Sequence, residues 1–145
     1  MKMTRIVAAL SLAAACSTAF AATPIEQRQQ VFKDYKKTVG AMGKMVKGET
    51  PYNKDEFAKL AAHLDVLAQQ PWQYFTPGSD KGKTEARPEI WSKPAEFKQS
   101  VEKHQAETAK LKQVAAGGDL GAVKAQFSAV QKTCKSCHDA FRKDD

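Results

Sequence analysis

The stretch "LGAVKAQFSAVQKTCKSCHDAF" (residues 120–141) combines an apolar helical stripe with a compact group of cysteine and histidine. Its apolar side chains recur every three or four positions, which is the period of one face of an α-helix. These side chains are Leu120, Val123, Phe127, Val130, Cys134, Cys137 and Phe141. Both cysteines lie in phase with the apolar face, so we expect their thiols to point into the interior of a helical fold.

The motif formed by Cys134, Cys137 and His138 is typical of covalent haem c attachment. Two thioethers one helical turn apart can hold the porphyrin edge while the next residue supplies an imidazole to the iron. A zinc site would need more ligands, yet His63 and His104 fall on other predicted helices without a partner at ligand spacing. A thioredoxin-type dithiol lies at a helix N-terminus, whereas this motif lies near a helix C-terminus, where the dipole disfavours a thiolate. Haem is therefore favoured, with a local disulfide or a metal site as the alternatives.

Three further amphipathic helices are predicted upstream of this stretch. The first begins at a capping box, Thr23 to Glu26, and ends at Gly48. The others are expected at 53–70 and 94–116, and Asp119 caps the last helix. Residues 71–94 contain four prolines and two glycines, too many for a regular element, and form one long connection. The pattern predicts an all-α fold, an antiparallel four-helix bundle with one long crossover loop between helices two and three.

The N-terminal segment has the features of a secretory signal. A basic start (Lys2 and Arg5) precedes a short apolar run, and Ala19-Phe20-Ala21 fits the cleavage pattern, so residues 1–21 are the predicted signal and 22–145 the single domain. A lipoprotein site at Cys16 is the alternative. The apolar run is too short for a membrane anchor. Removing Lys2 and Arg5 lowers the formal net charge from +7 to +5, and the surplus is too scattered for nucleic-acid binding.

Further motifs link the chain to a known family. They are "VKGETPY" (46–52), "PWQYFTPG" (71–78), "TEARPEIW" (84–91), "GGDL" (117–120) and "CKSCHDAFRK" (134–143). On the basis of these motifs, residues 22–145 resemble the cytochrome c′ family. The resemblance implies one haem c per chain, attached covalently to Cys134 and Cys137, with His138 as the proximal iron ligand. It also implies a periplasmic protein that binds small diatomic gases, above all nitric oxide, and forms a homodimer through helices one and two.

The resemblance places Phe32 opposite the proximal histidine, counting back from Gly48 of the "VKGETPY" stretch. Low-spin relatives carry methionine there, which closes the sixth coordination position and makes a plain electron carrier. Phenylalanine cannot ligate iron, so we expect a pentacoordinate, high-spin haem. The bulk of the phenyl ring is expected to weaken carbon monoxide binding while nitric oxide still reacts.

Arg28 occupies a position in the apolar stripe of the first helix, where an unpaired charge is costly. Haem propionates would offset that cost, and a solvated side chain that extends to the surface is the alternative. The resemblance also places Gln29 beside the haem, Thr84 and Glu85 at its edge, and Arg142 near the proximal imidazole, with a solvated surface position as the alternative for Arg142. Trp72 and Phe75 are expected to wall the haem, with ordinary burial under the loop as the alternative. A carboxylate repels propionates, so Glu85 is expected to act through its backbone.

Three functions are compatible with these patterns. The first is a gas-binding haem protein. Catalysis is not expected, because the sequence shows no combination of a nucleophile and a base. The second is a low-spin electron-transfer cytochrome of the same fold, whose mild positive charge would dock an acidic redox partner. The third is a bundle without haem, in which the cysteines form a disulfide. A visible spectrum separates the three.

Overall fold

The computed structural model describes residues 21–143, and the predicted signal segment lies outside these residues except for Ala21. Four long helices make up the fold: α1 (Pro24–Lys47), α2 (Lys54–Leu67), α4 (Pro94–Gly117) and α5 (Leu120–Phe141). Two short helices, η1 (Pro71–Tyr74) and α3 (Glu89–Ser92), lie in the connection between α2 and α4. Among the described residues there is no strand, and one isolated bridge joins Ala86 to Arg142. The predicted all-α bundle is confirmed.

Local capping chemistry sets the helix ends. The Thr23 side chain accepts a bond from the Glu26 backbone, and the Glu26 carboxylate accepts one from the Thr23 backbone, which completes the predicted capping box. Gly48 ends α1 in the left-handed conformation, with φ of 78°. Asn53 and Asp119 cap α2 and α5 through their side chains. These caps satisfy backbone donors that the first helical turn leaves unpaired.

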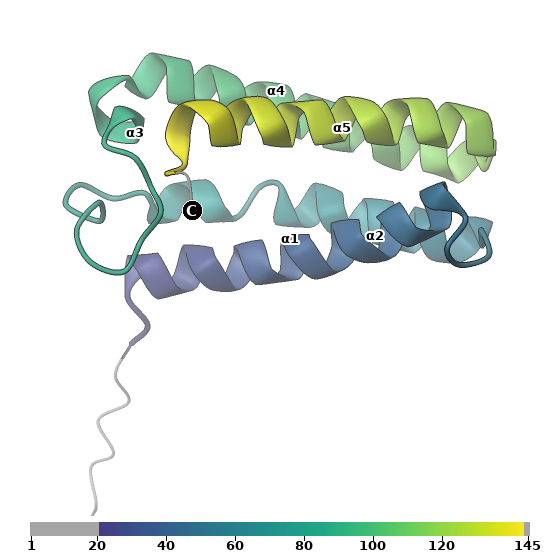
Figure 1. The fold of residues 1–145 in the computed structure, drawn as a ribbon, viewed down its shortest axis with the longest axis horizontal. Coiled ribbons are helices and arrows are strands. Elements are labelled where there is room, and N and C mark those ends of the chain that lie inside the picture. Colours follow the sequence, from purple (N-terminus) through teal and green to yellow (C-terminus); the bar gives the residue numbers. More distant parts are fainter. Residues whose placement is uncertain (1–20, 144–145) are drawn as a thin grey trace, which may run out of the picture.

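The long helices run antiparallel in two pairs, α1 with α2 and α4 with α5 (Figure 1). α4 packs closely against both α2 and α5, and α1 packs against α2. α1 and α5 also lie side by side, but they contact each other at few places. No helix among residues 21–143 is long and apolar enough to cross a membrane.

The crossover between α2 and α4 is more regular than the sequence suggests. The expectation that residues 71–94 lack a regular element is wrong, because proline is tolerated in the first turn of a short helix and Pro71 begins η1 in this way. The crossover returns to the bundle through backbone bonds to the end of α5. Arg87 donates to the Phe141 carbonyl at 2.9 Å, and Lys143 donates to the Glu85 carbonyl at 2.8 Å. The crossover thus covers the end of the bundle where α1 begins and α5 ends (Figure 1).

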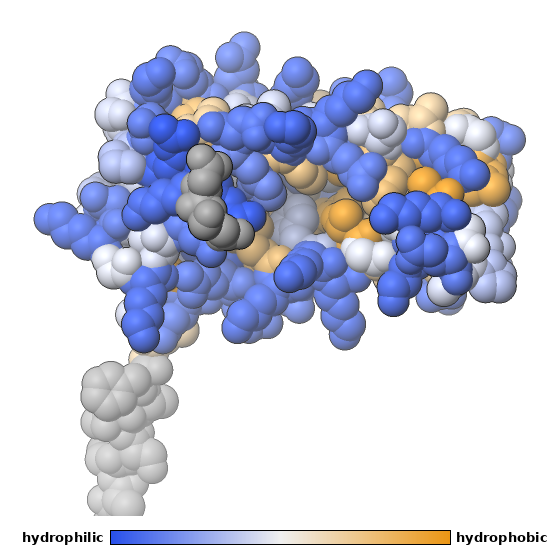
Figure 2. Space-filling model, viewed as in Figure 1, coloured by the Kyte–Doolittle hydropathy of each residue, from blue (hydrophilic) through white to orange (hydrophobic). Residues whose placement is uncertain are grey.

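The apolar interior divides into two clusters. The larger one fills the bundle and includes Met42, Phe57, Leu64, Leu111, Val123 and Phe127. The smaller one, built on Ala86, Ile90 and Phe141, lies beneath the crossover. Apolar surface also gathers between α1 and α5, bordered by hydrophilic side chains (Figure 2). This strip, where α1 and α5 face each other with little contact, is called the α1–α5 seam below.

Candidate functional site

Cys134 and Cys137 lie at the junction of the two apolar clusters. Cys134 packs against the larger cluster and Cys137 against the smaller one, and both side chains are half-buried. The two thiols are not joined in a disulfide. Burial raises the pKa of Cys134, and burial together with its neighbour raises the pKa of Cys137 to about 11, so both sulfurs are protonated thiols at neutral pH. The disulfide alternative thus has no support in this structure.

The surroundings of the thiols fit a large, flat, apolar group. The cysteines come from α5 beside the α1–α5 seam, which two adjacent helices leave weakly packed. Elsewhere in the described chain the long helices interlock, as expected for a bundle that buries its apolar faces. Cys134 and Cys137 would hold a porphyrin beside this strip, and His138 follows them directly on α5. No group of three or more histidine, cysteine or acidic residues among residues 21–143 forms a metal cluster, which argues against zinc.

His138 is exposed on the last full turn of α5, next to a basic side chain. Desolvation first, and then the positive charge of Arg142, lower the pKa of His138, while Asp139 and Glu85 oppose this shift. A neutral imidazole at neutral pH is the form that ligates a metal. Arg142 in turn donates to the Glu85 carboxylate, with 2.6 Å between Nε and Oε2. Glu85 therefore carries a charged pair with Arg142, beside the backbone role predicted for it.

Arg28 is 2% exposed and acts as a clamp on the crossover. Its two terminal nitrogens donate four hydrogen bonds, to the Tyr74 carbonyl (3.0 Å), the Ser79 hydroxyl (2.8 Å), the Ser79 carbonyl (2.6 Å) and the Thr84 hydroxyl (2.8 Å). The guanidinium also lies 4.5 Å from the centre of the Phe75 ring. These hydrogen bonds satisfy the buried guanidinium of Arg28. The predicted alternative, in which the side chain extends to the surface and is solvated, is therefore wrong. Only Nε–H is left for a propionate, so that predicted contact is limited to one donor.

Gln29 and Thr84 lie beside the same clamp. The exposed Gln29 donates to the Lys83 carbonyl at 2.9 Å, and the Thr84 hydroxyl accepts from the Ala86 backbone at 3.1 Å as well as from Arg28. Together with Glu85 they bring α1, the crossover and the end of α5 to one end of the bundle. The predicted edge residues are therefore neighbours in space, and their contact with haem stays a prediction.

Phe32 is half-buried on α1 and belongs to a closed ring of four side chains, called here the aromatic quartet: Phe32, Tyr35, Trp72 and His104. The centroid distances are 5.7 Å (Phe32 to Tyr35), 5.8 Å (Tyr35 to His104), 6.4 Å (His104 to Trp72) and 6.1 Å (Trp72 to Phe32). Trp72 stacks further on Phe75, at 6.3 Å. The predicted haem-facing residue and the predicted wall are therefore parts of one aromatic structure.

His104 is held by a threonine next to the attachment motif. Its Nδ1 lies 2.7 Å from the hydroxyl of Thr133, and that hydroxyl donates to the Val130 carbonyl at 2.7 Å. Because the single hydroxyl proton is used by Val130, Nδ1 is the protonated nitrogen and donates to Thr133. Burial lowers the pKa of His104 to about 4. His104 is thus a neutral, hydrogen-bonded interior residue that connects α4 to α5.

This buried histidine makes stability depend on pH. The folded pKa of about 4 lies below the ordinary histidine value of 6.5, so the unfolded chain binds the proton more readily and the folded state loses stability as pH falls below 6.5. We expect the free energy of unfolding to drop by about 2 kcal/mol between pH 7 and pH 5 from this residue alone. Urea denaturation at several pH values measures it.

The matched variants for that measurement are His104→Phe and His63→Gln. His104→Phe should flatten the slope over this pH range, whereas His63→Gln, at an exposed position on α2, should leave it unchanged. An equal slope in wild type and His104→Phe would assign the pH dependence to other groups.

The roles of two side chains at the site could not be predicted from the sequence. Ser79, which receives two bonds from Arg28, lies in a glycine- and charge-rich loop where serine is ordinary. Tyr35 follows the helical period of α1 and is predicted only as a core residue. The structure shows that its hydroxyl is buried without a hydrogen-bond partner among residues 21–143.

Comparison with known proteins gives consistent matches. The family profile described as Cytochrome C' matches residues 23–142. A cytochrome c′ from Alcaligenes xylosoxydans xylosoxydans is 39% identical over 119 residues, which cover 82% of this chain and 92% of that protein. The structure of cytochrome c prime from Shewanella frigidimarina matches with a TM-score of 0.81 at 36% identity, over 83% of this chain and 94% of that chain. A nitric oxide complex of a mutant of cytochrome c prime from Alcaligenes xylosoxidans matches with a TM-score of 0.80 at 37% identity. This match covers 87% of this chain and 100% of that chain.

Proposed function

This chain belongs to the cytochrome c′ family and carries covalently attached haem c, and on this premise we propose that it is a periplasmic gas-binding protein. The haem, when bound, supplies an iron that takes a small diatomic gas at an open coordination position. Nitric oxide is the proposed ligand, and a relative of the same fold has been crystallised as a nitric oxide complex. Electron transfer to a redox partner is a secondary role.

The residues of this chain have separate tasks in that function. Cys134 and Cys137 would form the thioether bonds, and His138 would hold the iron from the α5 side through a neutral imidazole. Phe32 is the residue on which the proposal depends, because its half-buried ring packs against the bundle interior within the aromatic quartet and offers no atom that can ligate iron. The aromatic quartet excludes water from the α1 side.

Visible absorption of the purified haem protein, followed by titration with nitric oxide and carbon monoxide, tests the proposal. We expect high-spin bands in the ferric and ferrous forms, a spectral change with nitric oxide at low concentration, and a weak response to carbon monoxide. A low-spin, six-coordinate spectrum that neither gas perturbs would instead favour the electron-transfer cytochrome. Protein without a Soret band would contradict haem attachment altogether.

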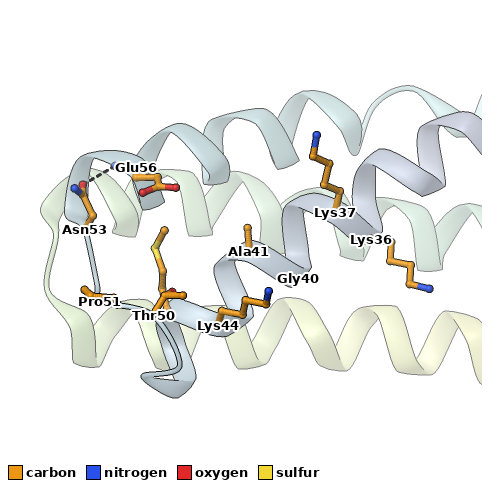
Figure 3. A pocket seen from close by; sticks show the side chains of 10 residues that line it. Lys36, Lys37, Gly40, Ala41, Lys44, Thr50, Pro51, Asn53 and Glu56 are labelled. Atoms are coloured by element: carbon orange, nitrogen blue, oxygen red, sulfur yellow. Dashed lines mark hydrogen bonds between the residues drawn. The ribbon is translucent and has the colours of Figure 1, made fainter.

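The homodimer through α1 and α2 is part of the same proposal. A groove between these helices is lined by small residues of α1, Gly40 and Ala41, and flanked by Lys36, Lys37 and Lys44 (Figure 3). On α2, Val66 is 53% exposed, the one large hydrophobic side chain of residues 21–143 that is open to this extent.

Like charges brought together across a twofold axis repel, so salt should strengthen the dimer. Sedimentation velocity at low and high salt measures this, and Val66→Glu should yield monomers. A monomer at all salt concentrations would exclude the dimer.

A further inference from the structure

The hydroxyl group of Tyr35 is a buried donor without an acceptor in the described chain. Tyr35 is 8% exposed, and its oxygen has no hydrogen-bond partner among residues 21–143. Burial first, and then the nearby Cys134 and Asp65, raise the pKa of Tyr35, so the oxygen keeps its proton and acts as a donor. A buried donor left without an acceptor is costly, and such groups in folded proteins usually meet a water or a ligand.

The nearest polar candidate within the chain does not take this bond. His104 packs against Tyr35 with 5.8 Å between ring centres, but its Nδ1 is directed to Thr133, and no hydrogen bond joins its Nε2 to Tyr35 in the part of the chain that the structure describes. The remaining neighbours of the Tyr35 ring include Phe32, at 5.7 Å, which offers no acceptor. The acceptor is therefore expected from outside the chain.

The position of Tyr35 indicates what that acceptor is. On α1, Tyr35 follows Phe32 by about one turn, so both side chains lie on the same face of the helix, where Tyr35 meets His104 of α4 and Phe32 meets Trp72 of η1. Tyr35 belongs to the larger apolar cluster against which Cys134 packs, so its ring lies in the same part of the interior as the attachment motif. A molecule held between Phe32 and the haem plane would lie in the same space.

We propose that Tyr35 is the hydrogen-bond donor to a diatomic ligand on the α1 side of the site, with His104 and Phe32 holding the phenol ring in place. This inference rests on the proposed gas-binding function and adds a residue that determines ligand affinity. Phe32 limits the space for the ligand, and Tyr35 stabilises the partial negative charge on its outer atom. The two residues act in opposite directions on binding, one by steric exclusion and one by polar attraction.

Tyr35→Phe in the ferrous haem protein tests the donor, with nitric oxide as the probe. Removing one neutral hydrogen bond should speed nitric oxide release by about two- to tenfold. The N–O stretching band should move to higher frequency, because hydrogen bonding to the outer atom weakens that bond. In heavy water the band should shift in the wild type and stay fixed in the variant.

Tyr52→Phe is the matched control, since the Tyr52 hydroxyl donates to the Gly118 carbonyl at 3.4 Å, at the opposite end of the bundle. It should leave both the release rate and the band unchanged. If Tyr35→Phe has the same N–O stretching band and the same nitric oxide release rate as the wild type, the inference is wrong, although the proposed gas binding still holds. If Tyr35→Phe does not yield haem protein, the heavy-water shift in the wild type decides alone, and its absence overturns the inference. A wild-type protein that binds neither gas would overturn both.

Discussion

Phe32→Ala should raise the affinity for carbon monoxide by about 10- to 100-fold. The Phe32 ring is held by contacts with Tyr35, Trp72 and Phe75, at 5.7, 6.1 and 6.5 Å between centres, so it cannot turn aside freely to admit a ligand. Forcing extra atoms into a packed site costs about 1–3 kcal/mol, and removing the ring releases that cost. Equilibrium titration of the ferrous protein with carbon monoxide gives the two affinities.

Two variants at the same position separate size from chemistry. Phe32→Leu should have an intermediate affinity, because it removes part of the volume. Phe32→Met supplies a sulfur ligand and should convert the spectrum to a low-spin form that carbon monoxide binds poorly. Equal affinities in wild type and Phe32→Ala would show that the ring does not obstruct the ligand.

Arg28→Ala should lower the free energy of unfolding by about 4 kcal/mol, measured by urea denaturation of the haem protein. The substitution removes four hydrogen bonds from one buried guanidinium and leaves the Tyr74 and Ser79 carbonyl groups without their donor. The crossover would also lose the contact between the charge and the Phe75 ring.

Arg28→Lys and Ser79→Ala are the graded controls. Lysine keeps the charge but not the planar fork that reaches four acceptors, so its loss should be about half as large. Ser79→Ala removes one of the four acceptors of Arg28 and the hydroxyl that donates to the Thr76 carbonyl at 2.8 Å, and it should cost about 1–2 kcal/mol. If Arg28→Ala costs no more than Ser79→Ala, the clamp on the crossover is not what stabilises this end of the bundle.

Much of the fold follows from local signals in the sequence. The apolar period of 120–141 and the caps at Thr23, Asn53 and Asp119 determine where helices begin and which face they bury, and the structure confirms these positions. The attachment motif is equally local, because both cysteines and His138 lie within one short segment. Such features depend on residues a few positions apart, so a single sequence contains them.

The partners within the site are a different matter, because they come from distant parts of the chain. The acceptors of Arg28 lie 46 to 56 residues away, and two of them are backbone carbonyl oxygens, which any residue type would supply. The buried hydroxyl of Tyr35 and the bond between His104 and Thr133 likewise depend on how helices meet. The sequence therefore predicts which residues approach the haem better than it predicts what each of them contacts.

The two backbone bonds between the crossover and the end of α5 have a consequence for how His138 is positioned. Arg87 to Phe141 and Lys143 to Glu85 fasten the last turn of α5, which carries His138, to a segment more than fifty residues earlier in the chain. The place of the His138 imidazole therefore depends on two separate elements of the fold, the helix that carries it and the loop that is bonded to the end of that helix.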